Sequence, residues 1–391
     1  MNPDLIFNNT EIAFSLKSDS ELERAYFLFK MISIQPLVRI GTAATNFAIK
    51  AHLPIEGLIR ATVFDHFCGG VNEEDCLPVI EKMYNKGVSS VLDYSVEGKE
   101  SEVEFDAAKD MIIKIISFAK NNNAMPIAVF KPTGFGRFYL YEKIGKGEQL
   151  TTEEQIEWNR VEQRFNDVCK KAKTCNVAVL IDAEESWMQD AADGLVTKMM
   201  RTYNTEKAIV FNTLQMYRHD RLAFLEAEHE KAKSGKYFLG YKLVRGAYME
   251  KENERAESKG YATPICENKF ATDENFDKAV HFMMDNLENM ALFAGTHNED
   301  SSYLLMRLMS EKGIANNDSR VWFGQLYGMS DHISFNLAYK NYNVAKYIPF
   351  GPVKDVMPYL IRRAEENTSV AGQTGRELAL LTKEKKRRKN A

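Results

Sequence analysis

Two adjacent arginines near the end of the chain, Arg362 and Arg363, are the residues whose spacing most clearly indicates chemistry. On a helix, Glu366 lies four and three residues after them, so one carboxylate can brace both guanidinium groups. Tyr359 lies on the same side of that helix, and Pro358 is expected in its first turn. A braced arginine pair matches a carboxylate bidentately, so the pattern predicts a carboxylate-binding site, with a solvated helix face as the alternative.

The composition restricts the class of protein. The chain has 391 residues, 45% of them hydrophobic, which is enough for one large core or two ordinary ones. Its 51 Lys and Arg residues and 55 Asp and Glu residues give a net charge of −4, which argues against a nucleic-acid partner. The 5 cysteines are scattered without a CxxC pair, so we expect reduced thiols and no structural zinc site.

The two ends of the chain and its hydropathy predict a cytoplasmic protein. Residues 1–30 lack the basic start and apolar run of a signal peptide, and no uncharged apolar run is long enough to span a bilayer. Residues 383–389 are basic except for one acid, and we expect them to be disordered. Because basic segments bind anionic lipid, the prediction includes peripheral association with the inner face of the membrane.

Eight short apolar or β-branched runs alternate with amphipathic helical patterns after Gly87. Eight strands alternating with helices over roughly 260 residues are typical of a (βα)8 TIM barrel. A doubly wound open sheet is the alternative, but no GxGxxG follows the first strand. The predicted strands are Val88–Tyr94, Ile127–Lys131, Val177–Asp182, Ala208–Gln215, Phe238–Arg245, Met290–Thr296, Val321–Leu326 and Asn343–Ile348.

The same patterns predict three regions. We expect an N-terminal helical arm at 1–86, a catalytic barrel at 87–375 and a basic C-terminal tail at 376–391. Two connections, 145–152 and 250–273, are longer than packing requires, which makes them candidate lids.

All eight predicted strands end in residues that bind or ionise. In a (βα)8 barrel these ends converge on one mouth, whose neighbouring interior is normally filled by Val, Ile and Leu. Each residue alone has a structural explanation, but their coincidence at eight ends indicates a ligand site. The residues are Asp93 and Glu97, Lys131, Asp182, Gln215, Lys242 with Arg245 and Tyr248, Thr296 with His297, Gln325, and Tyr347.

Other catalytic classes lack their motifs. The seven histidines are dispersed, and Asp182, Glu184 and Glu185 are too few ligands to support a Mg²⁺ site. No GxxxxGK[ST] loop and no GxSxG elbow is present, which argues against a P-loop nucleotide site and an α/β-hydrolase.

Six segments, taken together, resemble the proline dehydrogenase family. They are FKP at 130–132, LIDAEE at 180–185, TLQMY at 213–217, KLVRGAY at 242–248, GTHN at 295–298 and YLIRRAEEN at 359–367. The resemblance extends in order from about residue 60 to residue 370. The segment FCGGVNEEDC at 67–76 is most similar to the monofunctional and mitochondrial-type members.

This resemblance implies a distorted barrel that holds FAD non-covalently, with a final helix over the barrel mouth. It implies oxidation of L-proline to Δ1-pyrroline-5-carboxylate by hydride transfer to FAD, the first step of proline catabolism, with a quinone as electron acceptor. A 4-hydroxyproline oxidase of the same family is the alternative, because a ring hydroxyl requires only one altered wall, and Tyr347 is where we expect that change. The alternative from another class is a non-enzymatic scaffold that binds anionic lipid or RNA.

The resemblance also implies residue roles. Glu97 matches an acid that helps to position the arginines, and Lys242 and Met249 depart from the Arg and Trp that bifunctional members usually carry. We also expect Lys131 to pair with Asp182. The implied catalytic residues are Lys131, Asp182, Tyr347, Arg362 and Arg363. The implied substrate contacts are Lys131, Tyr248, Leu326, Tyr347, Tyr359, Arg362 and Arg363. The implied flavin contacts are Gln215, Lys242, Val244, Gly246, Thr296, His297, Gln325 and Glu366.

Overall fold

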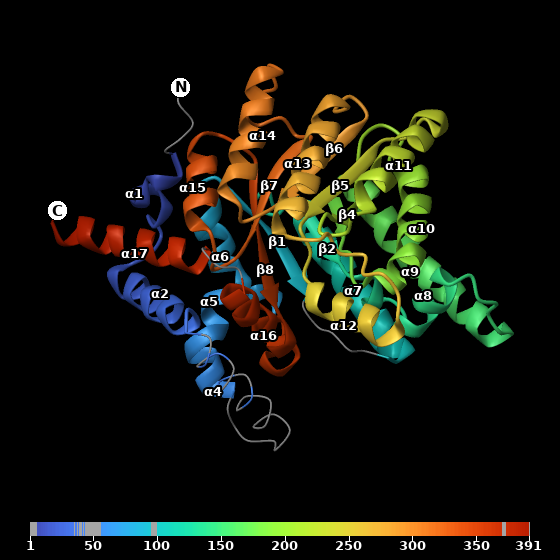
Figure 1. Cartoon of the computed structure of the whole chain (residues 1–391), viewed down its shortest axis with the longest axis horizontal. Helices are drawn as coiled ribbons and strands as arrows, with labels where there is room; N and C mark the ends of the chain where they lie inside the picture. The colour runs from blue at the N-terminus through green and yellow to red at the C-terminus, as the bar shows by residue number, and fades with distance from the viewer. Residues whose placement is uncertain are drawn as a thin grey trace. The chain divides into compact units, whose positions relative to one another are not determined.

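Eight parallel strands form a closed barrel in the order β1 to β8, which confirms the predicted (βα)8 architecture and excludes the open sheet (Figure 1). The computed structural model describes residues 6–34, 36, 38, 41, 43, 56–94, 100–369 and 373–390, with the backbone alone at 56, 58, 61, 364–369, 373 and 374. The strands are β1 (Val88–Tyr94), β2 (Ile127–Phe130), β3 (Ala178–Ile181), β4 (Val210–Gln215), β5 (Leu239–Val244), β6 (Met290–Gly295), β7 (Val321–Leu326) and β8 (Val344–Phe350).

The chain divides into two compact units, and each is described by itself. Unit 1 comprises residues 1–97 and 325–391, and unit 2 comprises residues 98–324. In unit 1, β1 pairs with β8 from Val88 opposite Val344 to Tyr94 opposite Phe350. In unit 2, parallel pairing runs from β2 through β3, β4, β5 and β6 to the first part of β7.

Helices precede or follow the strands of unit 2 along the chain, and two of those described begin with reciprocal caps. Ser101 with Glu104 and Thr151 with Glu154 form capping boxes, in which each side chain accepts a backbone N–H that the first helical turn leaves unpaired. The helices are α7 (Glu102–Ala119), α8 (Phe138–Gly145), α9 (Thr152–Cys175), α10 (Ser186–Tyr203), α11 (Arg221–Gly235), α12 (Met249–Lys259), α13 (Lys269–Asp285) and α14 (Glu299–Glu311), together with the 3-10 turn η3 (Pro132–Gly134).

More than half of the loop expected at 250–273 is helical. Helix α12 occupies Met249–Lys259, and α13 begins at Lys269. The buried Glu252 of α12 accepts hydrogen bonds from the backbone N and the hydroxyl of Ser186, both at 2.6 Å. Since Ser186 is the first residue of α10, the α12 carboxylate caps a helix that lacks its own side-chain cap.

Unit 1 combines the first and last parts of the chain around β1 and β8. Helix α16 begins at Val353, so Pro358 lies inside it and not in its first turn as the sequence predicted. The unit also contains η1 (Ile6–Asn8), α1 (Thr10–Ala13), α2 (Asp19–Ile32), α4 (Glu56–Ile59), η2 (Arg60–Phe64), α5 (Asp65–Phe67), α6 (Glu73–Tyr84), α15 (Asp331–Tyr339), α16 (Val353–Ser369) and α17 (Gln373–Lys389).

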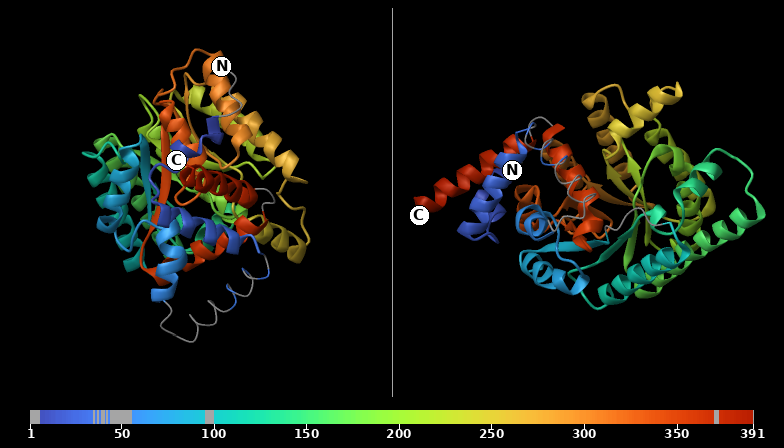
Figure 2. Two further views of the ribbon diagram at one scale, coloured as in Figure 1. Left: turned by 90° about the vertical axis from the view of Figure 1, so that its left-hand side faces the viewer. Right: turned by 90° about the horizontal axis from the view of Figure 1, so that it is seen from below.

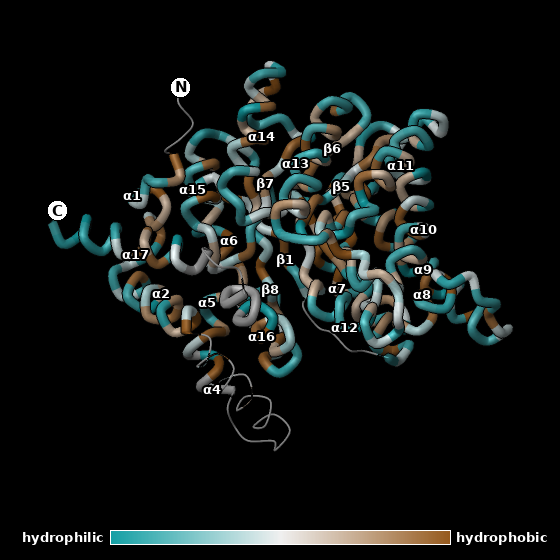
Figure 3. The backbone as a smooth tube through the Cα atoms, in the orientation of Figure 1, coloured by the Kyte–Doolittle hydropathy of each residue, from teal (hydrophilic) through white to brown (hydrophobic). Residues whose placement is uncertain are grey.

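The basic tail belongs to an ordered helix, so the expectation of disorder at 383–389 is wrong. Helix α17 lies beside α2 in every view (Figures 1 and 2). Leu380 and Leu381 pack into a buried cluster with Phe14, Leu22 and Phe29. The hydrophilic residues follow at the far end of the helix (Figure 3).

Most of the basic side chains of that segment bind other residues of unit 1. Lys385 pairs with Glu23 at 2.6 Å, and Arg388 pairs with Asp19 at 2.8 Å. The buried Glu384 accepts hydrogen bonds from both Arg387 and Arg388. Part of the positive charge that suggested a lipid-binding tail is therefore used to attach α17 to the N-terminal helices.

In the part of the chain that the structure describes, no helix is both long and apolar enough to cross a membrane. Among the same residues, no group of three or more His, Cys, Asp and Glu side chains could hold a metal ion. All five cysteines are described, and all are free thiols.

Candidate functional site

An ion pair between Asp182 and Lys242 links the end of β3 with β5 in unit 2. Asp182 follows β3 directly, and its backbone N donates to Phe130 O at 2.9 Å. Lys242 lies on β5, 5% exposed, and its Nζ donates to Asp182 Oδ1. The two residues are 60 positions apart, so only the order of strands in the barrel brings them together. The pair unites a predicted catalytic acid with a predicted flavin-binding cation.

Lys131 lies at the end of β2, where a buried carboxyl group faces its turn. Glu184 Oε1 accepts the Thr133 hydroxyl at 2.7 Å, and Glu184 Oε2 accepts the Thr133 N–H at 3.0 Å. Burial raises the pKa of Glu184 to about 7, although the nearby Lys131 charge and the Thr133 hydrogen bonds act in the opposite direction. The structure therefore gives Lys131 an electrostatic partner, Glu184, that the sequence argument did not assign to it.

Gln215 ends β4 and is 3% exposed. Its Nε2 donates to the backbone carbonyl of Glu184 at 2.6 Å. This hydrogen bond fixes the plane of the carboxamide, so its oxygen has a defined direction. The predicted flavin contact Gln215 and the buried carboxyl group Glu184 thus belong to one hydrogen-bonded group.

Arg245 connects the end of β5 with the end of β6. Its guanidinium donates to Asp273 at 2.6 Å, to Thr296 Oγ1 at 2.9 Å and to Ser301 Oγ at 3.0 Å. Thr296 Oγ1 also accepts the Asn298 N–H at 3.1 Å. The fork of Arg245 therefore holds Thr296, a predicted flavin contact, and His297 is the next residue along the chain.

Gly246 occupies a position that requires glycine. Its φ of +138° lies in a region that other residues rarely adopt, and a Cβ there would lie 2.2 Å from the Tyr217 ring. Val244 precedes it at the end of β5, and its carbonyl accepts the Met216 N–H at 2.7 Å. Tyr248 then forms the N-cap position of α12. The missing Cβ makes room for the Tyr217 ring, so glycine is required here by the packing of the segment after β5.

Four of the predicted substrate contacts lie in unit 1 on or beside α16. Tyr359, 6% exposed, belongs to the buried apolar cluster against which Leu326 packs. The Arg363 guanidinium lies 5.4 Å from the centroid of the Tyr359 ring, within range of a cation–π interaction. Arg362 and Arg363 are both half-buried. Leu326, Tyr359 and Arg363 thus meet through one apolar cluster, and Arg362 is the neighbour of Arg363 on the helix.

The remaining predicted residues of unit 1 lie on the last two strands. Gln325 on β7 is 2% exposed, and its Oε1 accepts the Ser334 hydroxyl at 2.8 Å. Tyr347 on β8 is 7% exposed, and its carbonyl accepts the Tyr327 N–H at 2.8 Å. Glu97 and the side chain of Glu366 lie outside the described residues, so the bracing of the arginine pair stays a prediction.

A buried lysine that the sequence argument missed fixes the backbone next to these residues. Lys346 on β8 is 0% exposed and donates to Met329 O at 2.6 Å and Leu326 O at 3.3 Å. It also pairs with Asp331 at 2.8 Å, and Asp331 in turn pairs with Lys17 at 3.1 Å. Burial alone would raise the pKa of Asp331, but the two lysines outweigh that effect and hold the pKa below its ordinary value.

Three residues that received no catalytic, substrate or flavin assignment from the sequence therefore help to organise the strand ends: Glu184, Arg245 and Lys346. The first two lie inside motifs of the resemblance, LIDAEE and KLVRGAY, which was a usable signal. Lys346 had no such signal. A lysine in an apolar strand is expected to be exposed, and its burial depends on carbonyl groups at the end of β7 and in the loop after it, 20 and 17 residues earlier.

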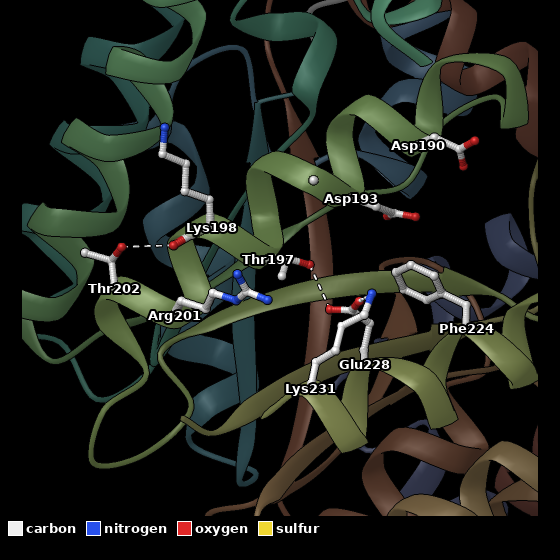
Figure 4. A pocket seen from close by; sticks show the side chains of 10 residues that line it. Asp190, Asp193, Thr197, Lys198, Arg201, Thr202, Phe224, Glu228 and Lys231 are labelled. Carbon is white, nitrogen blue, oxygen red and sulfur yellow. Dashed lines mark hydrogen bonds and ion pairs between the residues drawn. The ribbon is translucent and has the colours of Figure 1, made fainter. Parts of the chain in front are cut away.

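A hollow of about 590 Å³ lies elsewhere in unit 2, between α10 and α11 (Figure 4). Its charges neutralise one another in part, because Glu228 accepts a hydrogen bond from Thr197 at 3.0 Å and one from Lys231 at 2.7 Å. None of the described residues that line it is a predicted site residue. The hollow is therefore not the candidate site.

Comparison with known proteins agrees with the resemblance. A family model described as Proline dehydrogenase matches residues 76–376. The carbapenem antibiotics biosynthesis protein CarD of Pectobacterium carotovorum subsp. carotovorum is 34% identical over 334 residues, covering 85% of this chain and 86% of that protein. Proline dehydrogenase 1, mitochondrial, of Arabidopsis thaliana is 31% identical over 422 residues, covering 96% of this chain and 85% of that protein. The Homo sapiens protein of the same name is 40% identical over 243 residues, covering 61% and 40%.

A solved structure is similar in fold. Proline utilization A (PutA) from Bdellovibrio bacteriovorus, inactivated by N-propargylglycine, matches with a TM-score of 0.73 and 19% sequence identity. The match covers 95% of this chain but 40% of the solved chain, so the present chain spans about two fifths of that larger protein. At this identity the likeness supports the fold alone.

Proposed function

Because this chain belongs to the proline dehydrogenase family, a family of flavin-dependent oxidoreductases, we propose that it oxidises L-proline to Δ1-pyrroline-5-carboxylate with FAD. We further propose that a quinone takes the electrons from the reduced protein. The observation that carries the proposal is the match of the family model to residues 76–376, which include every residue that we assign to the site.

The residues at the strand ends of unit 2 suit a non-covalent flavin. Gln215 has a carboxamide fixed by its bond to Glu184 O, which matches the alternating donors and acceptors of the flavin pyrimidine edge. Gly246 gives the segment after β5 a backbone conformation that other residues rarely adopt, and Thr296 with His297 supplies donors of the kind that bind a pyrophosphate. The family resemblance assigns flavin contacts to Lys242, Val244, Gln325 and Glu366 as well.

When bound, FAD supplies the two-electron acceptor for the hydride from proline, and the protein supplies placement and electrostatics. Arg362 and Arg363 bind the substrate carboxylate, because two guanidinium groups match its charge and its two oxygens. Leu326, Tyr347 and Tyr359 provide apolar and aromatic surface for the five-membered ring, and Tyr248 completes the set of substrate contacts. The amine must be neutral to help expel hydride, so the site binds the carboxylate strongly and leaves the nitrogen able to lose a proton.

Lys131, Asp182 and Lys242 have electrostatic roles in this proposal. The negative charge that accompanies the hydride is stabilised by fixed cations and donors close to the cofactor, and Lys242 is the cation assigned to that task. Asp182 holds the Lys242 ammonium in one position through their ion pair. Lys131 supplies a second positive charge at the end of β2.

The direct test is optical. The purified protein should be yellow, and L-proline added without oxygen should bleach the flavin absorption. Mass spectrometry should then find a product two hydrogens lighter than proline. A colourless protein that FAD cannot reconstitute would contradict the proposal and favour a non-enzymatic scaffold that binds anionic lipid or RNA.

The substrate requires its own experiment, since the relative from Pectobacterium is named for carbapenem biosynthesis and not for proline oxidation. We propose L-proline, and trans-4-hydroxy-L-proline is the second candidate within the family. Steady-state kcat/KM should be measured for both compounds, with a soluble quinone and with oxygen as alternative acceptors. A higher value for hydroxyproline would assign the chain to the second activity, and faster turnover with oxygen than with quinone would remove the quinone from the proposal.

A further inference from the structure

The Glu184 carboxyl group accepts two hydrogen bonds from the turn that follows Lys131. Both of its oxygens bind the same residue, Thr133, one through the hydroxyl at 2.7 Å and one through the backbone N–H at 3.0 Å. Two parallel hydrogen bonds define an orientation as well as a distance. Thr133 lies two residues after Lys131 in the 3-10 turn η3, so the carboxyl group restrains the position of that turn.

The turn itself is rigid, so a restraint on Thr133 reaches Lys131. The Gly134 N–H donates to Lys131 O at 3.0 Å and closes the turn. Pro132 has a fixed φ, and its carbonyl accepts the buried Tyr141 hydroxyl at 2.7 Å. The backbone of Lys131 therefore moves only if the contact between Thr133 and Glu184 also moves.

Glu184 is held from its other side as well. Its backbone N–H donates to Gln189 Oε1 at 2.9 Å, and its carbonyl accepts Gln215 Nε2 at 2.6 Å. Asp193 Oδ1 then accepts the other end of Gln189 at 2.8 Å, which anchors the group to α10. Because the Glu184 backbone is fixed in this way, its carboxyl group can determine the position of the turn that contains Thr133.

From these contacts we infer that Glu184 is a positioning residue, which sets the place of the Lys131 ammonium through Thr133 and the orientation of the Gln215 carboxamide through its own backbone. This inference rests on the proposed function, in which Lys131 and Gln215 serve substrate and cofactor. A role confined to folding is the competing explanation, because a buried hydrogen-bonded carboxyl group also stabilises the loop that contains it.

The first experiment combines Glu184→Gln and Lys131→Met. The amide keeps the size of the carboxyl group but replaces one of its two acceptors with a donor. If Glu184 acts through Lys131, Glu184→Gln should lower kcat/KM for proline about tenfold in the wild type and less than about twofold in the Lys131→Met background. Equal factors in both backgrounds, with equal losses in melting temperature, would overturn the inference and leave a purely structural role.

Glu185→Gln is the matched control. The neighbouring carboxyl group is equally buried, at 6% exposure, but it pairs with Lys251 of α12 and not with the Lys131 turn. Its substitution should change kcat/KM by less than about twofold. A loss in this control as large as that in Glu184→Gln would show that any buried carboxyl group of the segment has the same effect, and the specific assignment would fail.

Thr133 supplies a variant that does not alter the carboxyl group. Thr133→Val removes the hydroxyl and keeps both the size of the side chain and the backbone N–H, so kcat/KM should fall about threefold to tenfold. Thr133→Ser restores a hydroxyl at the same place and should recover most of the loss. Failure of serine to recover what valine loses would contradict the hydrogen-bonded connection.

A flavin-free measurement separates this inference from the proposed function. Acylation of Lys131 by a small anhydride, followed by mass spectrometry, reports how strongly the ammonium form is stabilised. Removal of the Glu184 charge should raise the acylation rate at least about twofold, whereas Glu185→Gln should leave it unchanged. If the wild type neither binds flavin nor oxidises proline, the proposed function fails while this result still stands. An unchanged rate in Glu184→Gln overturns the inference in an active enzyme.

Discussion

Lys346 of unit 1 and Lys242 of unit 2 make the same kind of pair in different surroundings. Each is a lysine on a barrel strand that binds an aspartate, and the two lysine side chains are 0% and 7% exposed. The Lys346 ammonium also donates to two backbone carbonyls, and its partner Asp331 binds a second lysine, Lys17. The Lys242 pair joins β5 to the residue that follows β3 in unit 2.

The difference shows what decides the role of a buried charge. Lys346 places three hydrogen bonds on protein acceptors and joins β8 to the loop before α15, so it determines where the chain runs. Lys242 pairs with Asp182, which follows the carboxyl end of β3, the end of a barrel strand at which ligands bind. Residue type and burial are nearly equal in the two pairs, and location in the barrel distinguishes them.

The largest effect is expected on stability in unit 1. Lys346→Met removes the ammonium and leaves Asp331 buried with one lysine fewer, so the free energy of unfolding should fall by about 3–5 kcal/mol. Denaturant unfolding measures this loss, with the exposed Lys340→Met as the matched control, which should stay within about 0.5 kcal/mol of wild type. A loss below about 1 kcal/mol would mean that the network is not structural and would remove the contrast with Lys242.

A second stability effect distinguishes Glu184 of unit 2 from Asp331 of unit 1. The pKa of Glu184 rises from 4.5 in the unfolded chain to about 7 in the folded protein. Between pH 4.5 and pH 7 the folded state therefore keeps a proton that the unfolded state has released. Stability is therefore lost as pH rises through this window, by about 3 kcal/mol for the single group. Glu184→Gln lacks the titration and should gain stability relative to wild type by about that amount from pH 4.5 to pH 8. Parallel stability curves for the two proteins would show that the carboxyl group does not titrate in this range.

The arginine pair tests whether unit 1 has a role in substrate binding besides the structural role shown by Lys346, because Arg362 and Arg363 both lie in unit 1. Arg362→Met and, separately, Arg363→Met should each lower kcat/KM for proline about tenfold to a hundredfold, mainly through KM, since each removes charge-assisted hydrogen bonds to the carboxylate. Lysine at either position should rescue only in part, because a point charge does not reproduce the guanidinium fork.

Pyrrolidine, which lacks the carboxylate, is the control for the arginines. The wild type should oxidise it poorly, and the arginine variants should lose little more. If proline and pyrrolidine turnover fall by the same factor in the variants, the arginines do not bind the carboxylate. Unit 1 would then contribute structure without substrate contacts from this pair.

The smallest effect is expected from the end of α17. Truncation after Leu381 removes two ion pairs with α2, that of Lys385 with Glu23 and that of Arg388 with Asp19. The free energy of unfolding should therefore fall by about 1–2 kcal/mol, while turnover with a soluble dye stays unchanged. Binding to anionic vesicles should be measured on the same protein. Weaker binding after truncation would support a membrane role for the tail, and equal binding by both forms would leave it with a structural role alone.

Much of the barrel could be read from the sequence. All eight predicted runs coincide with strands, two with identical bounds and the others within two residues at each end. This agreement has a physical reason, because strands of a parallel barrel are covered on both faces and appear as short apolar runs between amphipathic helices. The strand-end residues among the predicted site follow from the same logic, since the end of each strand is visible as the point where apolar residues give way to polar ones. Val244, Gly246, Leu326 and Glu366 were assigned by the family resemblance instead.

Only the tertiary structure decided which of these residues meet. Three contacts join residues far apart in the chain. They are the ion pair of Asp182 with Lys242 on β5, the hydrogen bonds of Glu184 with Thr133, and the hydrogen bond of Lys346 to the Met329 carbonyl. The charged tail was predicted to be disordered, but it belongs to helix α17, whose apolar side chains pack against Phe14, Leu22 and Phe29. The spacing of residues along the chain predicts a single helix or strand, because the contacts within a helix join residues only three or four positions apart. Pairings between elements depend on packing and burial, which no short stretch of sequence contains.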